Sequence, residues 1–581
     1  MKKTGAWLVR YALEQIGVRQ TFGIPGVHNT ELYDELNSSG QIEPVLVSHE
    51  VGAAFMADAV SRTSNQIGCL AIVPAAGVTH AASGIGEAFL DGIPMLVIAG
   101  GIRSDSAYGY QLHEVDQHSL LKPITKGTYL ISDHNEILST IYEAYRLATS
   151  GEPGPVFIEV PVNIQLDKGQ IDQLIQYQAT EYQLENLAAT EQLIEAAVAE
   201  LSQASRPGIF VGWGARKAVA AVTQIAEHLG APVSTTLQGL SSFPADHPLH
   251  AGFGFGPAAV PSSYEAFKEC DCLLAIGTRF AEIATGSFGV TVPDKLIHLD
   301  INPNVFSRNF PASIAIEGDS RVTVPMLADK LLATSEPADD SAMRELIARE
   351  KETYRKEWRE YQSFERVNPV HLFDHLRAAL DDDAIVVLDD GNHTFLAAEL
   401  MPIHQHGQLI SPTDFNCMGY AVPATIGAKL VNPNKQVVSI IGDGAFNMTC
   451  MELTTAVKMQ LGMVMFIFND GELSQIAQAQ ERPYNRTTCT DLPNVDYKAL
   501  AAAVGCEYLA IRNNEAVESS VIQAMSLAAN NRPVIVNVLV DYSKATRFTD
   551  GVVKTNIKRL PTGTKVRMVG RALYRKIKKP E

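Results

Sequence analysis

Short apolar stretches alternate with amphipathic ones along the first 185 residues. The apolar stretches include RQTFGI, PVLVSHE, GCLAIV, PMLVIAG and GPVFIEVP, which have the length of β-strands. The segments between them carry apolar residues at helical spacing. Strands that alternate with helices predict a parallel sheet covered on both faces. We therefore expect an α/β domain over residues 1–185.

The same alternation returns twice further along the chain. After a polar linker near residues 178–186, a helix with Thr190 as its N-cap precedes the strands GIFVGWGA, APVSTTL, CLLAIGTRF and KLIHLDI. A charged helical stretch over residues 336–366 leads to a third set of strands, AIVVLDDG, QVVSIIGDG, VMFIFND and PVIVNVLVDY. The sequence thus predicts an α/β protein of three consecutive doubly wound parallel-sheet domains, bounded at 1–185, 186–335 and 367–546, with a tail over 547–581.

Charge is spread unevenly along the chain. The 581 residues carry a formal net charge of −18, yet residues 554–579 contain ten Lys or Arg and no acid. A strongly acidic protein is a poor partner for nucleic acid, so we expect none. The basic tail is a solvated extension, an arm folding over an acidic body or an anionic substrate, or a surface helix touching a membrane.

Nothing in the sequence indicates membrane insertion or export. No apolar run reaches the roughly 18–20 residues of a transmembrane segment. The N-terminus takes up a helical pattern with Arg10 and Glu14, unlike a signal peptide. The seven cysteines are scattered without a CxxC repeat and are expected to be core thiols. We expect a cytoplasmic protein without a transmembrane segment.

The segment from Gly442 to Leu473 carries the strongest chemical signal. Asp443 follows one buried strand, a helix is expected over 447–459, and Asp470 follows the next strand. Parallel strands joined by such a crossover end at the same edge of the sheet, where ligands bind in open α/β folds.

Two carboxylates brought together at that edge need a cation, because like charges repel. Mg²⁺ prefers carboxylate and phosphate oxygens, and Gly442 and Gly444 allow close approach of a diphosphate. A GDG turn alone would merely reverse the chain. The second acid after another apolar strand favours a magnesium–diphosphate site.

This segment resembles the signature of thiamine-diphosphate enzymes. Nearly all of the first 545 residues resemble enzymes of the acetolactate synthase (acetohydroxyacid synthase) large-subunit type. The resemblance implies a pyrimidine-binding, a central and a diphosphate-binding domain. It implies that Asp443 and Asp470 bind Mg²⁺ through their side chains and Glu472 through its carbonyl, although asparagine is usual at position 470. The other implied cofactor contacts are Gly26, Asn392, His393, Met418, Gly442, Gly444 and Ala445.

The resemblance also gives Glu50, which ends the strand PVLVSHE, a catalytic role. In the family this glutamate hydrogen-bonds the aminopyrimidine ring of thiamine diphosphate and promotes loss of the C2 proton. Because Glu50 and Asp443 belong to different domains, the family arrangement implies a homodimer with a shared active site, with a homotetramer as a further option. The central domain binds FAD in some members and nothing in others, so the resemblance leaves open whether this chain binds FAD.

The chain departs from the acetolactate-synthase pattern where substrate selectivity is set. His113 replaces a glutamine, Ala479 a tryptophan and Ile283 an arginine, and Gly100–Gly101 stands for glycine–glutamine. His28 and His113 are candidates for acid–base work on a carbonyl, and His49 and His80 are further histidines of this kind.

Three functions are consistent with the sequence. The first is decarboxylation of a 2-oxo acid such as pyruvate, followed by ligation to an acceptor carbonyl. The second is a non-ligating decarboxylase, or a lyase that acts on 2-hydroxyacyl-CoA or diketone substrates. The pair Asp116–Gln117 resembles the sequence of the 2-hydroxyacyl-CoA lyases. The third is a non-catalytic thiamine-diphosphate-binding protein, and the intact Glu50, Asp443 and Asp470 argue against it.

Overall fold

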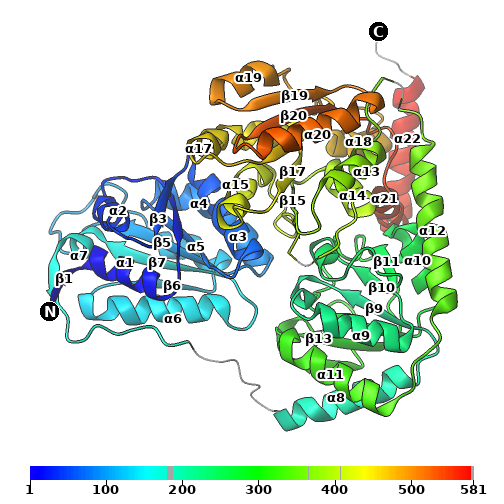
Figure 1. Cartoon of the computed structure of the whole chain (residues 1–581), viewed down its shortest axis with the longest axis horizontal. Helices are drawn as coiled ribbons and strands as arrows, with labels where there is room; N and C mark the ends of the chain where they lie inside the picture. The colour runs from blue at the N-terminus through cyan, green and yellow to red at the C-terminus, as the bar shows by residue number, and fades with distance from the viewer. Residues whose placement is uncertain (180–186, 364, 406, 578–581) are drawn as a thin grey trace.

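The computed structural model describes residues 1–179, 187–363, 365–405 and 407–577 (Figure 1). It contains three parallel six-stranded sheets in chain order, each covered by helices, which confirms the expected fold class. The expected boundary at residues 185–186 lies outside the described residues. No helix within the described ranges is long and apolar enough to cross a membrane.

The N-terminal sheet has the strand order β3-β2-β4-β5-β7-β6. Its strands are β2 (Gln20–Gly23), β3 (Glu43–Leu46), β4 (Gly68–Ile72), β5 (Met95–Gly101), β6 (Gly127–Leu130) and β7 (Pro155–Pro161). Its helices are α1 (Gly5–Gln15), α2 (Thr30–Asn37), α3 (Glu50–Thr63), α4 (Ala76–Leu90), α5 (Gln117–Leu121), α6 (Ile137–Thr149) and α7 (Val162–Leu166). An antiparallel pair, β1 (Lys2–Thr4) and β8 (Lys168–Gln170), joins the start of this domain to its end. Every residue of β4 and β5 is buried, because helices cover both faces.

The central sheet has the order β11-β10-β9-β12-β13-β14. Its strands are β9 (Pro207–Val211), β10 (Val233–Thr235), β11 (His250–Phe253), β12 (Cys272–Ile276), β13 (Lys295–Asp300) and β14 (Ile314–Glu317). Its helices are α8 (Leu187–Ser202), α9 (Val219–Leu229), α10 (Pro261–Phe267) and α11 (Ser320–Thr334). Thr190, the expected N-cap, lies inside α8 instead, because the preceding Leu-Ala-Ala has a high helix propensity and extends the helix backwards.

The C-terminal sheet has the order β16-β15-β17-β18-β20-β19. Its strands are β15 (Ile385–Leu388), β16 (Leu409–Ile410), β17 (Val437–Gly442), β18 (Val464–Asn469), β19 (Glu507–Ile511) and β20 (Val534–Leu539). The helices α12 (Ser341–Arg359) and α13 (Pro369–Ala379) precede it. The others are α14 (Asn392–Leu400), α15 (Ala421–Val431), α16 (Asp443–Thr449), α17 (Leu453–Lys458), α18 (Ser474–Tyr484), α19 (Tyr497–Val504) and α20 (Val517–Ala528). The helix expected over 447–459 is interrupted by a 3₁₀ turn at Cys450–Glu452.

The two outer sheets share one topology. Counted within its own sheet, each has the strand order 2-1-3-4-6-5, whereas the central sheet has the order 3-2-1-4-5-6. The latter order reverses direction between β9 and β12, and such a switch point is where doubly wound sheets bind nucleotides.

The N- and C-terminal domains of one chain pack against each other through α3 and α15 (Figure 1). Small residues bring these helices close: a Cβ atom at Gly427 would lie 2.3 Å from the carbonyl oxygen of Met56. Residues of both domains therefore belong to a single hydrophobic core.

Two helices follow the last sheet, α21 (Arg547–Arg559) and α22 (Thr562–Ile577). α21 packs against the central domain, where a Cβ atom at Gly551 would lie 2.4 Å from Cα of Ala258. α22 runs along the outer edge of the molecule beside α18 (Figure 1). Part of the basic tail is thus folded onto the body.

Candidate active site

A cavity of about 180 Å³ lies at the carboxyl edge of the C-terminal sheet. It lies where β17 and β18 end, as the spacing of Asp443 and Asp470 predicts. Nine of the expected residues line it together: Asn392, His393, Met418, Gly442, Asp443, Gly444, Ala445, Asp470 and Glu472.

Asp443 is held at the end of β17 by backbone hydrogen bonds. Its Oδ1 accepts from the N–H of Gly444 and its Oδ2 from the N–H of Gly471, each at 2.8 Å. Burial raises the pKa of this carboxyl above its ordinary value. A cation in the cavity would reverse that shift by stabilising the carboxylate.

Asp470 lies in the same cavity and repels Asp443. Burial first, and then the charge of Asp443, raise the pKa of Asp470 to about 6. Ser474 donates a hydrogen bond to one of its oxygens. A buried and a half-buried carboxylate in one cavity form an oxygen donor set suited to a hard divalent cation.

The part of the cavity wall beside Gly442 suits a polar ligand. His393 is buried, its pKa is lowered to about 3 by burial, and its Nε2 has no hydrogen-bond partner among the described residues. Gly391 lies against its ring with φ +151°, and an added Cβ would lie 2.7 Å from Cε1 of His393. A neutral imidazole nitrogen, a glycine-lined wall and two carboxylates fit a magnesium-bound diphosphate.

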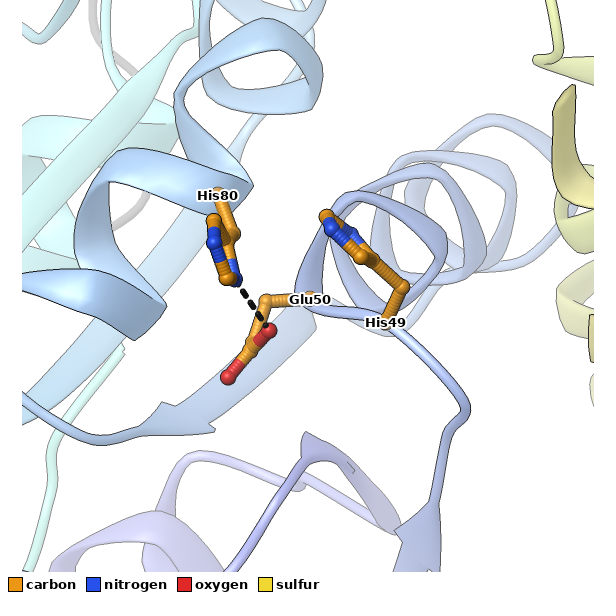
Figure 2. A group of neighbouring side chains, drawn as sticks. All are labelled: His49, Glu50 and His80. Carbon is orange, nitrogen blue, oxygen red and sulfur yellow. Dashed lines mark hydrogen bonds and ion pairs between the residues drawn. The ribbon is translucent and has the colours of Figure 1, made fainter.

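Glu50 lies in the N-terminal domain, at the first residue of α3, where it is buried (Figure 2). His80 of α4 lies with its Nδ1 3.0 Å from Oε2 of Glu50. His49 stacks on His80 with the ring centroids 4.6 Å apart, and its Nδ1 accepts the N–H of Val51. The two histidines therefore orient the start of α3 and the carboxyl of Glu50.

Glu452 of the C-terminal domain holds the backbone just before Glu50. Its Oε1 accepts the N–H of His49 at 2.9 Å and its Oε2 accepts the N–H of Ser48 at 3.0 Å. Burial raises the pKa of Glu452 to about 7 despite these bonds. The 3₁₀ turn that interrupts the expected helix is what carries Glu452.

His28 and His113 face each other elsewhere in the N-terminal domain. Their ring centroids are 5.0 Å apart, and neither Nδ1 has a hydrogen-bond partner within the described part of the chain. Burial, and then the charge of His113, lower the pKa of His28. His113 itself has φ +71°, so a turn rather than a regular element presents it. Gly26, also expected to contact the cofactor, lies nearby in the loop before α2.

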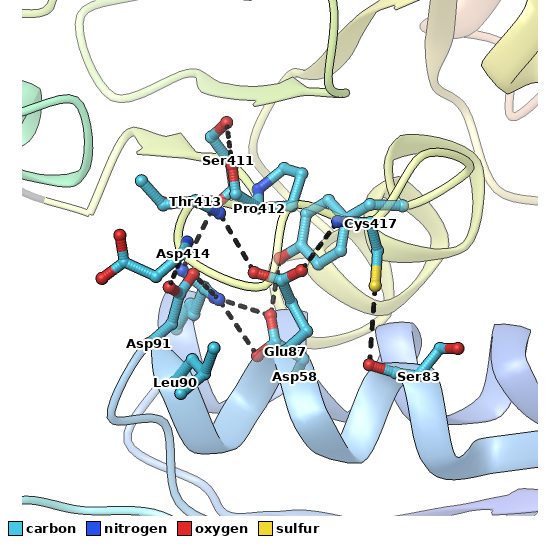
Figure 3. A network of polar contacts seen from close by, with 12 residues as sticks. Asp58, Ser83, Glu87, Leu90, Asp91, Ser411, Pro412, Thr413, Asp414 and Cys417 are labelled. Atoms are coloured by element: carbon cyan, nitrogen blue, oxygen red, sulfur yellow. Dashed lines mark hydrogen bonds and ion pairs between the residues drawn. The ribbon is translucent and has the colours of Figure 1, made fainter. Parts of the chain in front are cut away.

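A buried polar network joins α4 to the segment that precedes Met418 (Figure 3). Glu87 accepts the N–H of Thr413 with Oε1 and the N–H of Cys417 with Oε2, both at 3.0 Å. Arg62 pairs with Asp58 at 2.6 Å and with Asp91 at 2.8 Å, and all three side chains are fully buried. Glu87 thereby fixes both ends of the turn over residues 413–417.

The substitutions that depart from the acetolactate-synthase pattern lie in two places. Ile283 and Ala479 line one cavity of about 260 Å³ next to the diphosphate cavity. Gly100 lies against His28, where a Cβ atom would be 2.2 Å from the carbonyl oxygen of that residue.

Two further cavities, of about 110 and 340 Å³, lie at the switch point of the central sheet. Both are lined by Gly214, Gly277, Arg216 and Asp300. No carboxylate among the described residues pairs with Arg216, whose pKa burial and neighbouring arginines lower to about 10. Burial raises the pKa of Asp300, at the end of β13, to about 6.

The sequence patterns did not reveal the roles of Glu452 and Glu87. Each is a single acid inside a helical stretch, and its partners are more than 300 residues away in the chain. His80 was one of several candidate histidines, and only the fold places it beside Glu50.

Comparisons with known proteins agree with this geometry. Three family models match in order: the N-terminal TPP binding domain of thiamine pyrophosphate enzymes at residues 3–120, their central domain at 194–327 and their C-terminal TPP binding domain at 389–538. An acetolactate synthase large subunit of Corynebacterium glutamicum is 31% identical over 93% of this chain and 87% of its own length. The large subunit of acetolactate synthase isozyme 3 of Escherichia coli is 30% identical over 93% of this chain and 95% of its own length.

Proposed function

The chain belongs to the thiamine pyrophosphate enzymes of the acetolactate synthase large-subunit type, and on that premise we propose that it decarboxylates a 2-oxo acid and ligates the remaining acyl unit to a second carbonyl compound. The observation that carries the proposal is the cavity in which Asp443, Asp470 and His393 meet at one sheet edge. A non-catalytic binding protein would not need Glu50 buried and oriented by His80.

The C-terminal cavity would hold Mg²⁺ and the diphosphate. Asp443 and Asp470 would bind the cation through their side chains, and Glu472 would add its backbone carbonyl. Asn392 and His393 would contact phosphate oxygens, and Met418 would support the ring system. When bound, thiamine diphosphate would supply a nucleophilic thiazolium carbon and a ring that stabilises the electron pair left on the substrate's carbonyl carbon when CO₂ departs.

Glu50 would share a proton with the ring nitrogen of the aminopyrimidine. Nδ1 of His80 lies 3.0 Å from Oε2 of Glu50, so this contact would hold the carboxyl in place beside the ring. His28 and His113 are proposed to move a proton at the carbonyl oxygen of the substrate. The Nδ1 atoms of both rings have no hydrogen-bond partner among the described residues, and the lowered pKa of His28 keeps that imidazole neutral and free to accept a proton.

The central domain is proposed to bind a nucleotide, a class that includes FAD. Support comes from its strand order, the glycines after β9 and β12, the acid Asp300, and Arg216, which pairs with no carboxylate in the described part of the chain. Arg216 would meet phosphate and Asp300 a ribose hydroxyl. Mass spectrometry of small molecules released from the denatured protein should show thiamine diphosphate and a nucleotide; absence of both after purification with added cofactors would contradict the proposal.

Product analysis with pyruvate tests the reaction itself. Formation of acetoin or acetolactate indicates ligation, whereas acetaldehyde alone indicates simple decarboxylation. The variant Glu50→Gln should lose about 100-fold or more in the rate of CO₂ release, since Gln cannot exchange the proton. Full activity of that variant would refute the proposed role of Glu50.

A further inference from the structure

A cavity of about 340 Å³ lies between the central domain, α12 and the end of α14, and we call it the α12 cavity. None of the described residues lines both this cavity and the diphosphate cavity. α14 connects them, because His393 near its start lines the diphosphate cavity and Leu400 at its end lines the α12 cavity, about 10 Å further along the helix axis. The volume falls in the range of small-molecule sites, about 300–1,000 Å³.

Most of the wall of the α12 cavity is apolar. Its larger apolar members are Leu240, Phe253, Val260, Leu400, Met401 and Ile403. Three of its four Lys, Arg, Asp and Glu side chains already have partners or water. Arg355 forms an ion pair with Asp374, Glu399 accepts a hydrogen bond from Tyr354, and Glu352 is exposed to solvent. The fourth charged group is Lys351.

Lys351 has no carboxylate within ion-pair distance among the described residues. Its Nζ donates to the carbonyl oxygen of Ala245 at 3.2 Å and to Nδ1 of His250 at 3.3 Å, and both of these acceptors are uncharged. Burial lowers the pKa of Lys351 to about 8, and the exposed Asp246 opposes this only from beyond ion-pair distance. A partly buried ammonium without a counter-charge, in a wall that is mostly apolar, favours an anionic ligand.

His250 offers a second donor in the same wall. Burial, and then the charges of Lys351 and His247, lower its pKa well below the ordinary value, so the ring is neutral. Because Nδ1 accepts from Lys351, the ring proton lies on Nε2. Nε2 is buried and has no hydrogen-bond partner within the described part of the chain. The two oxygens of a carboxylate could accept from Lys351 and from this N–H.

We propose that the α12 cavity is a second ligand site, which binds a small carboxylate with a short apolar chain. The carboxylate would accept hydrogen bonds from Lys351 and His250, and the chain would lie along the apolar wall that includes Val260 and Met401. A neutral ligand of the same length would leave the ammonium without a counter-charge, so the site should distinguish ligands by charge. Binding at this site does not require the proposed reaction.

Ligand binding can be measured by ¹⁹F NMR on the full chain, with thiamine diphosphate and Mg²⁺ added to fill the diphosphate cavity. The probes are pentanoate and pentan-1-ol, each with a terminal CF₃ group, which share the fluorinated chain and differ in charge. The carboxylate should bind about tenfold more tightly than the alcohol, because it gains a charge-assisted hydrogen bond to Lys351.

Lys351→Met keeps the length of the side chain and removes its charge. This variant should weaken binding of the carboxylate about tenfold and leave binding of the alcohol unchanged, so the preference for the carboxylate disappears. Lys356→Met is the matched control, because Lys356 lies on the same helix with its side chain exposed. It should keep the tenfold preference of the unmodified protein.

Equal affinity for the two probes, no binding of the carboxylate, or an unchanged preference in Lys351→Met would overturn the inference. Circular dichroism would reveal a folding defect in Lys351→Met, and Ala348→Glu then tests the same site. Ala348 lines the cavity from an exposed position on α12, where Glu is a good helix former. Its charge should weaken binding of the carboxylate about fivefold and leave the alcohol unaffected, whereas equal binding of the carboxylate with and without it would contradict the site.

Discussion

At the scale of single residues, Glu452 shows how one buried carboxyl links two domains. It accepts hydrogen bonds from Ser48 and His49, immediately before Glu50. The fit is close, because a Cβ atom at Gly52 would lie 2.4 Å from Oε1 of Glu452. Any residue other than glycine at position 52 would push this carboxyl away from the turn that presents Glu50.

The raised pKa of Glu452 predicts a pH dependence of stability. Its pKa rises from 4.5 to about 7 on folding, so the folded protein binds the proton more tightly than the unfolded chain. The stabilisation from protonated Glu452 is therefore complete below pH 4.5 and is lost as pH rises through about 7, on the order of 3 kcal/mol in total. Urea unfolding between pH 4.5 and 8 should show this loss.

Glu452→Gln should remove that part of the pH dependence, although it also weakens the hydrogen bonds at every pH. Glu345→Gln, an exposed acid on α12, should leave the slope as in the unmodified protein. If the free energy of unfolding of Glu452→Gln changes with pH as steeply as that of the wild type, another group is responsible for the pH dependence.

Functional residues could be predicted where their position follows from the pattern of the segment that contains them. Asp443 and Asp470 each follow an apolar strand, and parallel strands end at one edge, so their meeting follows from local pattern. Glu87 and Glu452 carry no such mark, since a polar residue within a helix is ordinarily solvated. Their importance depends on groups brought in from other domains.

At the scale of elements, the turn over residues 413–417 is the connection between α4 and the cofactor cavity. Glu87 binds the backbone N–H groups at both ends of this turn, and Met418 follows directly. Cys417 adds a weaker contact, with its Sγ 3.6 Å from the carbonyl oxygen of Ser83. The position of Met418 thus depends on a carboxylate from another domain.

Replacing Glu87 with Gln should move this turn. An amide can accept only one of the two backbone hydrogen bonds, and its NH₂ group faces the other N–H. We expect a loss of about 1–3 kcal/mol in the free energy of unfolding and weaker thiamine-diphosphate binding by calorimetry. Ser83→Ala, on the same helix, keeps the backbone contact and should change neither quantity.

Among the elements, the long apolar strands could be predicted and the short ones could not. β4, β5, β17 and β18 are buried on both faces and read as continuous apolar runs. β16 has two residues and β6 is only half-buried, so neither leaves a clear pattern. The helix expected over 447–459 is broken because its middle turn faces the N-terminal domain.

At the scale of the whole molecule, the homodimer with a shared active site that the family resemblance implies can be tested with mixed dimers. Glu50→Gln and Asp443→Ala should each be inactive alone. In a dimer of one chain of each kind, one site would combine the intact Glu50 of one chain with the intact Asp443 of the other. Random assembly after co-expression should restore about a quarter of the wild-type activity. No recovery despite confirmed mixed dimers would place both residues of each site in one chain.

The contact between α3 and α15 also affects how the chain folds during translation. Tyr420 donates to Asp58 at 2.6 Å across 362 residues, within a cluster that includes the fully buried Arg62. The last strand of the N-terminal domain, β8, ends at Gln170, and α15 begins at Ala421. At translation rates of about 5–20 residues per second, the finished domain therefore waits about 12–50 s on the ribosome before its covering helix exists. Throughout that interval its packing face and charged cluster are open to water, so nascent chains should depend on chaperones until α15 emerges.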